Sequence, residues 1–333
     1  MEQQTEDILL DVRDLTTCFP GRGGRVYAVN GVSFQVRKGE ILGLVGESGC
    51  GKSATCRSII SLLPGGGKVT GGHILYQGRE LAGENERVMK DIRGKEIGMI
   101  FQEPMNTLNP VTTIEEQLVE TMRDKTMTKT VKKERAAELL KLVGIPSPKE
   151  RLSEYAHQFS GGMRQRAMIA IALAAGPKLL IADEPTTALD VTVQQQIIRL
   201  LLQLRDRLGM GMIFVTHDLA VASELCDRIA VMYAGRIVEE APAKELFQNP
   251  QHPYTRGLLR SIPSVEKKGA RLTPIPGSPP NLRKPPEGCA FAPRCPYRKA
   301  VCGQRQPAEK KVTDGHLFFC HGTGAEEEAG TSC

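Results

Sequence analysis

A glycine-rich run near residue 50 has the residue types and spacing of a phosphate-binding loop. Its pattern, Gly-x4-Gly-Lys-Ser, lies between an apolar stretch at 41–45 that predicts a buried strand and a helix-forming stretch at 54–63. Glycines let backbone N–H groups close around phosphate oxygens, and a helix start favours anions. An ordinary glycine turn is the weaker alternative because both flanking elements are present. The loop comprises Gly46, Glu47, Ser48, Gly49, Cys50, Gly51, Lys52 and Ser53.

Several side chains could complete nucleotide chemistry around this loop. Lys52 can reach the β- and γ-phosphates, and the Ser53 hydroxyl can ligate Mg²⁺. Asp183 and Glu184 end the apolar run 179–182, which predicts a buried parallel strand with acids where open α/β sheets bind ligands. Asp183 suits the Mg²⁺ shell, and Glu184 can polarise an attacking water. Two acids at a loop entry would be the alternative, but together with the phosphate loop they favour catalysis.

Other polar residues follow predicted strands or open a second helix. Gln102 ends the strand predicted at 96–101, and His217 ends the one at 211–216, where an otherwise structural histidine could contact a γ-phosphate. Tyr27 lies on a short strand upstream of the loop and is either a packing residue or a base-stacking one. A second anion-ready helix start, with a serine N-cap, precedes the helix predicted at 164–175 and comprises Ser160, Gly161 and Gly162.

Composition describes an ordinary globular protein with one large and one small domain. The 333 residues are 40% hydrophobic and 25% charged, and no apolar run has the length of a membrane span. The acidic residues 1–7 lack the features of a signal peptide, which predicts a cytosolic protein. Its nine cysteines are then thiols or metal ligands rather than disulfides. Cys50 stands at a helix start inside the phosphate loop, which predicts a lowered thiol pKa.

The character of the chain changes after residue 250. Residues 251–320 hold 11 of the 21 prolines and a net charge of +9, without the aromatic interleaving typical of nucleic-acid binding. The segment is predicted to be loop-rich and too poor in apolar periodicity to fold on a core of its own. It carries four cysteines at spacings longer than the tight pairs of structural zinc sites: Cys289, Cys295, Cys302 and Cys320.

These spacings favour a [4Fe–4S] cluster, with zinc or unbound thiols as alternatives. A structural or docking role is expected for the cysteine site, independent of ATP binding. The remaining tail, 322–333, is polar and predicted to be disordered.

Taken in order, these residues resemble ATP-binding-cassette (ABC) nucleotide-binding domains over residues 8 to 260. The resemblance rests on the phosphate loop, Gln102, Ser160-Gly161-Gly162, Asp183-Glu184, Ala188-Leu189-Asp190 and His217. It implies an α/β P-loop NTPase cassette with a mixed sheet and a helical insert. Two cassettes would bind ATP between one phosphate loop and the partner's Ser160 segment. It further implies an adenine-stacking Tyr27, Gln102 at Mg²⁺ and water, Glu184 as catalytic base, a γ-phosphate contact for His217 and nucleotide contact by Asp190.

A finer resemblance links the chain to the dipeptide, oligopeptide and nickel importer ATPases of bacteria. It rests on residues 101–110, 186–192 and 252–259. It implies a hetero- or homodimer of ATPase subunits at the cytoplasmic face of the membrane, two permeases and an external solute-binding protein. Nucleic acid is not an expected partner. The resembling importers also carry a C-terminal cysteine set, and some of them hold an iron–sulfur cluster there.

The resulting hypothesis is an importer ATPase for peptides, with ATP and Mg²⁺ at the cassette. Import of nickel or another small solute is the alternative, and a non-transport ABC ATPase is disfavoured because the chain lacks a second cassette or a coiled-coil insert. The expected domains are a cassette at 1–250, with its helical subdomain at about 103–165, and an appendage at 251–321.

Overall fold

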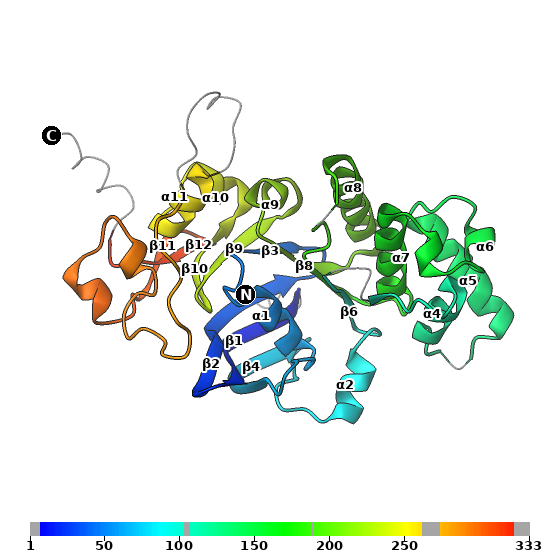
Figure 1. Cartoon of the computed structure of the whole chain (residues 1–333), viewed down its shortest axis with the longest axis horizontal. Coiled ribbons are helices and arrows are strands. Elements are labelled where there is room, and N and C mark those ends of the chain that lie inside the picture. Colours follow the sequence, from blue (N-terminus) through cyan, green and yellow to red (C-terminus); the bar gives the residue numbers. More distant parts are fainter. Residues whose placement is uncertain (1–6, 103–106, 125, 188, 262–273, 323–333) are drawn as a thin grey trace. The chain divides into compact units, whose positions relative to one another are not determined.

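The computed structural model describes residues 7–102, 107–124, 126–187, 189–261 and 274–322. The chain forms two compact parts (Figure 1). The first part comprises Met1–Leu9, Arg37–Gly39 and Glu84–Ile213, and the second comprises Leu10–Val36, Glu40–Gly83 and Phe214–Cys333. Ala188, the start of the predicted helical subdomain at 103–106 and the predicted tail from residue 323 lie outside the described residues.

The first part combines two parallel strands with a group of helices. Strands β6 (Ile97–Ile100) and β7 (Leu179–Asp183) pair in parallel, as predicted for the strand that carries the two acids. Residues 113–142 form the predicted helices, with α4 and α5 both packed on α7. The helices of this part are α2 (Glu86–Ile92), α4 (Ile114–Thr121), α5 (Lys129–Leu142), α6 (Pro148–Arg151), the 3-10 turn η1 (Ala156–Gln158), α7 (Gly161–Leu173) and α8 (Val191–Leu208).

The helix starts of this part follow local sequence rules. Thr113 and Glu116 form a reciprocal capping box at the start of α4, which satisfies two backbone N–H groups. The Ser160 hydroxyl accepts a hydrogen bond from the Met163 backbone N–H at 3.3 Å, so the predicted N-cap is confirmed. Helix α7 therefore begins at Gly161, and the Ser160 side chain just before it stabilises its first turn.

The second part contains a mixed sheet around β3 (Ile41–Val45). Within this part the strand order is β11-β12-β10-β9-β3. Strands β3 and β9 are parallel, whereas the pairs β9–β10, β10–β12 and β12–β11 are antiparallel. The other strands of this sheet are β9 (Arg228–Tyr233), β10 (Arg236–Pro242), β11 (Glu309–Thr313) and β12 (His316–Phe319), while β8 (Gly211–Thr216) contains the division between the two parts.

A second sheet has the order β2-β1-β4-β5. Tyr27, predicted on a short strand, lies on the longer strand β2. The predicted helix at 54–63 begins earlier and ends earlier. These elements are β1 (Ile8–Gly21), β2 (Gly24–Arg37), β4 (Lys68–Tyr76), β5 (Arg79–Glu80) and α1 (Lys52–Ile59).

The C-terminal segment is more ordered than its composition predicts. It contributes two strands to the mixed sheet through the pairing of β12 with β10, and it buries Tyr254, Phe291 and Phe318. A few large aromatic residues at irregular spacing form this core, so hydrophobic periodicity in the sequence does not predict it. Its described helices are α11 (Pro253–Arg260) and the turns η3 (Ala292–Arg294) and η4 (Ala300–Gly303), while α9 (Leu219–Leu225) and α10 (Ala243–Gln248) precede it in the second part. Among the described residues, every helix is too short or too polar to cross a bilayer.

Candidate nucleotide-binding and catalytic site

The phosphate loop joins the end of β3 to the start of α1. Gly46 has φ +154° and Gly51 has φ +108°, both in the region that side chains rarely adopt. A Cβ on Gly46 would collide with the Met232 carbonyl oxygen, and one on Gly51 would collide with that of Ala28. The backbone therefore requires glycine at both positions, which gives the sequence pattern its physical reason.

Lys52 is the buried cation of the loop. Its side chain folds back so that Nζ donates to the carbonyl oxygens of Gly46 at 2.8 Å and Glu47 at 3.1 Å. The residue is only 4% exposed, and Ser53 follows it, half-buried, in the first turn of α1. Lys52 thus lies over the loop, where an ammonium group can serve a phosphate.

The expectation for the Cys50 thiol is wrong. Burial raises its pKa and outweighs the opposing effects of the Lys52 charge and a backbone hydrogen bond from Lys52. The thiol is 5% exposed and faces the inside of the loop, so its distance from solvent matters more than its place at a helix start.

Glu47 is held by residues more than 200 positions away in the sequence. Its carboxylate accepts two hydrogen bonds from the Arg294 guanidinium, at 2.7 and 3.0 Å, and its backbone N–H donates to the Tyr254 hydroxyl at 2.9 Å. Burial raises the pKa of Tyr254, so the phenol stays neutral. The sequence interpretation gave Glu47 no partner and no role beyond membership of the loop. The sequence contains only two signals for such a pair. They are the acid inside the phosphate loop and the excess of basic residues in the segment 251–320.

Glu184 in the first part is oriented by two neighbours. Its Oε2 accepts hydrogen bonds from Gln102 Nε2 at 3.3 Å and Thr187 Oγ1 at 3.0 Å. It has φ +48°, a strained conformation for a residue with a side chain, directly after the fully buried Asp183. The structure thus brings together Gln102, Asp183 and Glu184, as expected for residues at the ends of β6 and β7.

The other predicted residues of the first part are found at helix starts. Ser160 and Gly161 are exposed, and a side chain on Gly161 would meet open space. Asp190 caps α8, where its carboxylate accepts the Val193 backbone N–H at 2.9 Å. This capping role was not predicted, although an Asp at the start of a long helix is a typical N-cap.

Tyr27 and His217 belong to the second part, as does the phosphate loop. Tyr27 is half-buried on β2, and its backbone N–H donates to the Leu282 carbonyl oxygen at 3.0 Å. His217 is exposed directly after β8. The predicted site residues are thus divided: Gln102, the Ser160 segment, Asp183, Glu184 and Asp190 lie in the first part and the others in the second.

The four C-terminal cysteines share one region of the second part. Burial raises the pKa of Cys289 and raises that of Cys295 to about 11, and the charges of neighbouring cysteines, Cys320 and Cys302 among them, add to both shifts. The Cys289 backbone N–H donates to the Cys302 carbonyl oxygen at 2.8 Å. Within the described ranges, however, no three Cys, His, Asp or Glu side chains gather closely enough to hold a metal ion.

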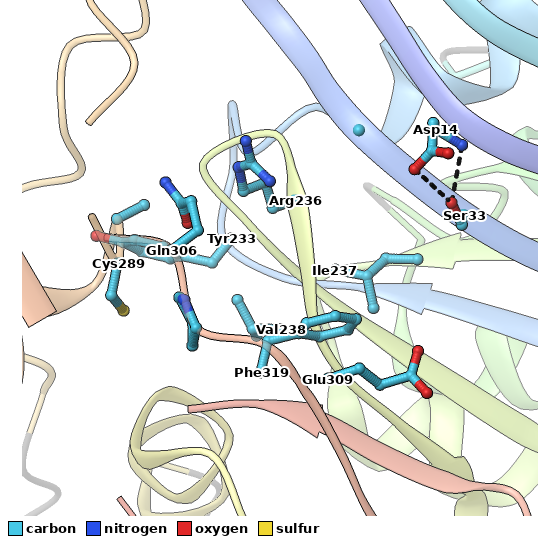
Figure 2. A pocket seen from close by; sticks show the side chains of 13 residues that line it. Asp14, Ser33, Tyr233, Arg236, Ile237, Val238, Cys289, Gln306, Glu309 and Phe319 are labelled. Carbon is cyan, nitrogen blue, oxygen red and sulfur yellow. Dashed lines mark hydrogen bonds between the residues drawn. The ribbon is translucent and has the colours of Figure 1, made fainter. Parts of the chain in front are cut away.

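A cavity of about 290 Å³ lies beside this region. Figure 2 shows Cys289 and Gln306 of the C-terminal segment lining it together with Tyr233 and Arg236 from β9 and β10. Burial lowers the pKa of Arg236. The cavity therefore marks where the C-terminal segment meets the mixed sheet.

Comparison with solved structures identifies the fold. The dimeric structure of a bacterial ABC transporter cassette matches with a TM-score of 0.63 at 28% identity, covering 70% of this chain and 98% of that one. Part of an ABC transporter complex from Clostridium perfringens matches with a TM-score of 0.63 at 27% identity, covering 73% and 92%. The fold and the loop therefore define an ABC cassette, a P-loop ATPase, as predicted.

Sequence relatives narrow the class further. The "ABC transporter" family matches residues 29–187, and the "Oligopeptide/dipeptide transporter, C-terminal region" family matches residues 238–302. A probable peptide ABC transporter ATP-binding protein of Sinorhizobium fredii is 51% identical over 94% of this chain and 95% of its own length. A dipeptide transport ATP-binding protein of Bacillus subtilis is 50% identical over 94% of each chain. The chain belongs to the family of ATP-binding subunits of peptide ABC transporters.

Proposed function

We propose that the chain powers uptake of di- and oligopeptides by a bacterial importer, acting at the cytoplasmic face of the membrane. The observation that carries this proposal is the full-length similarity to peptide transport subunits, which includes the C-terminal region as well as the cassette. We also propose that residues 1–250 form the cassette and residues 251–321 the appendage. The two family matches, at 29–187 and 238–302, support this division.

The loop residues from Gly46 to Ser53 bind the phosphates in this proposal, with Lys52 as the cation. Ser53, Gln102 and Asp183 supply hard oxygen donors, which fit Mg²⁺, and the ion when bound neutralises phosphate charge. Glu184 accepts the proton of the attacking water, while Gln102 and Thr187 keep its carboxylate aimed. Tyr27 stacks on the adenine, and His217 contacts the γ-phosphate.

The nucleotide is shared between two cassettes in this proposal. The exposed Ser160 and Gly161, with the half-buried Gly162 that follows them at the start of α7, would bind the phosphates held by a second ATPase subunit, with Asp190 nearby in the same interface. Two permeases and an external solute-binding protein complete the importer. The dimeric form of the similar cassette supports the pairing.

A substitution of Ser160 tests this sharing. Ser160→Arg should abolish hydrolysis by the assembled complex and leave ATP binding to the isolated subunit unchanged, because Ser160 serves the partner's nucleotide. Equilibrium ATP binding and ATPase activity measure the two effects. Loss of ATP affinity by the isolated subunit would refute the shared site.

We propose that Cys289, Cys295, Cys302 and Cys320 hold a [4Fe–4S] cluster, with zinc as the alternative. Two observations support a joint site: the Cys289 backbone N–H donates to the Cys302 carbonyl oxygen, and the charges of neighbouring cysteines help to raise the pKa of Cys289 and of Cys295. Protein purified without oxygen should be brown and contain about four irons per chain. One zinc per chain would favour the alternative, and a metal-free protein whose appendage resists protease would refute both.

Transport in cells tests the function itself. A strain that lacks the chain should fail to accumulate labelled dipeptides and oligopeptides, and the wild-type chain, but not Glu184→Gln, should restore uptake. Restored uptake of nickel without restored uptake of peptides would instead make the chain a subunit of a nickel importer. Permeases that co-purify with the chain from membranes would identify the assembly.

A further inference from the structure

The C-terminal segment contacts the proposed nucleotide site at two separate places. Arg294 and Tyr254 hold Glu47 of the phosphate loop, and Leu282 accepts a hydrogen bond from the backbone of Tyr27 on the adenine side. We propose that Arg294 and Tyr254 are positioning residues for ATP binding, which hold the phosphate loop through Glu47. The inference rests on the proposed assignment of this loop as the phosphate site.

Every N–H donor of the Arg294 guanidinium has a hydrogen-bond acceptor. Besides the two bonds to Glu47, its guanidinium donates to the carbonyl oxygens of Pro276 at 2.9 Å and Ile275 at 3.2 Å, and to the Tyr233 hydroxyl at 3.3 Å. These bonds use all five N–H donors of the side chain. With 4% of the side chain exposed, the residue is fixed in one orientation, and a lysine could not reproduce its planar fork.

The surrounding packing makes this contact rigid. Tyr254 lies against Tyr233 with ring centroids 4.6 Å apart, and Phe291 contacts the same two rings at 5.4 and 5.3 Å. Buried aromatic contacts of this kind add stability beyond the area they bury. The turn η3 that carries Arg294 is therefore packed against β9 and α11.

Charge explains why the loop needs this support. Glu47 is the one acid among the eight loop residues, and the loop must close around a polyanion. An uncompensated carboxylate there would repel phosphate, and the repulsion would be strong because the site is partly buried. The bidentate Arg294 cancels the charge and turns the carboxylate away into the appendage, while Tyr254 fixes the adjoining backbone N–H.

Nucleotide affinities of the full-length protein test the proposal. Replacing Arg294 by Met should raise the Kd for ATP about tenfold, raise that for AMP less and leave that for adenosine unchanged, because the freed carboxylate repels phosphates only. Adding Glu47→Gln to Arg294→Met should restore ATP affinity to within about threefold of wild type. Arg256→Met is the matched control, since Arg256 lies in the same segment and donates to the Pro250 carbonyl oxygen.

The possible results distinguish a specific effect of Arg294 and Tyr254 on phosphate binding from a general loss of stability. Equal losses for ATP and adenosine, or no restoration by Glu47→Gln, would overturn the proposal. Tyr254→Phe keeps the buried ring and removes only the hydroxyl, so it should weaken ATP binding about threefold even if Arg294→Met proves too unstable to assay. Unchanged ATP affinity in Tyr254→Phe would then refute it. Lys52→Ala separates the two assignments: retained ATP affinity there would refute the phosphate site itself.

Discussion

The phosphate loop and the C-terminal segment differ in how their conformations are determined. The loop depends on neighbours in sequence: glycines with positive φ, a strand before it and a helix after it. Tyr254 and Arg294 of the C-terminal segment depend on distant partners, because Tyr254 packs on Tyr233 of β9 and Arg294 pairs with an acid 247 residues earlier. Local sequence therefore largely determines the conformation of the proposed phosphate loop. Long-range contacts determine whether the Glu47 charge in that loop is neutralised.

This contrast alters the expected role of the appendage. The sequence predicted a structural or docking role for the four-cysteine site, without effect on ATP binding, because no second redox motif is visible in it. The contacts of Arg294, Tyr254 and Leu282 instead connect the appendage to both sides of the proposed nucleotide site. Four predictions compare residues expected to act on ATP directly with residues of the appendage expected to act through the loop or through stability.

The largest effect is expected for the catalytic base, which lies outside both regions. Glu184→Gln should lower ATP turnover by about 10²-fold or more, because the amide cannot accept the proton. ATP affinity should stay unchanged, because the substitution keeps the shape of the side chain that Gln102 and Thr187 contact. Steady-state ATPase assays and equilibrium binding measure the two quantities, with the exposed Glu120→Gln as control. Near-normal turnover would contradict the assignment.

The cation of the loop should show the next largest effect. Lys52→Ala should weaken ATP binding by about 10- to 100-fold, the scale of a lost charge-assisted hydrogen bond. The effect should exceed that of any change in the C-terminal segment, because Lys52 is expected to meet the phosphates directly. Binding titrations with ATP and adenosine measure it, and Lys38→Ala, outside the loop, is the control. A smaller loss than for Arg294→Met would reverse the roles of the two regions.

A cysteine substitution tests whether the appendage transmits its state to the loop. Cys295 directly follows Arg294, so Cys295→Ser should release the turn and raise the Kd for ATP about threefold to tenfold, together with loss of bound metal. Cys18→Ala, on β1 and outside the set of four cysteines, should change neither. Metal analysis and ATP binding on the same samples provide the measurement. Loss of metal with unchanged ATP affinity would restore the expectation of an independent appendage.

The smallest effect concerns the attachment of the appendage to the sheet. His316 is fully buried and contacts Glu239 and Glu245, each at 2.9 Å. Burial alone would lower the His316 pKa, but the hydrogen bonds and charges of these two glutamates outweigh it and raise the pKa. The stabilisation is therefore complete below the unfolded value of about 6.5 and is lost as pH rises through the folded value.

His316→Asn should accordingly destabilise the protein by about 1 kcal/mol at pH 6 and by less at alkaline pH. Denaturant unfolding of wild type and variant across this range measures the difference. Burial lowers the pKa of His252 to about 4, so His252 is neutral in the folded wild-type protein over this range. The exposed His157→Asn is the control. A loss that grows with pH would show that His316 is neutral in the folded protein.

Relations between neighbouring residues were predictable from the sequence. Glycines at Gly46 and Gly51 were predicted from the loop pattern, which needs residues with wide backbone freedom, although the Met232 and Ala28 carbonyl oxygens that leave no room for a Cβ there come from the fold. Asp183 and Glu184 were predicted at the end of β7, where Gln102 meets them, since parallel strands deliver their carboxyl ends to one edge. Such features depend on local dihedral angles and strand periodicity, which residue types encode directly.

Only the tertiary structure decided the electrostatics and the order of the distant segments. The Cys50 pKa follows from burial, and the Glu47–Arg294 pair follows from where β9, α11 and η3 converge in the second part. The order of the proline-rich C-terminal segment likewise comes from a few aromatic contacts and from β12 pairing with β10. Desolvation and ion pairing depend on which atoms become neighbours after folding, and spacing along the chain does not contain that information.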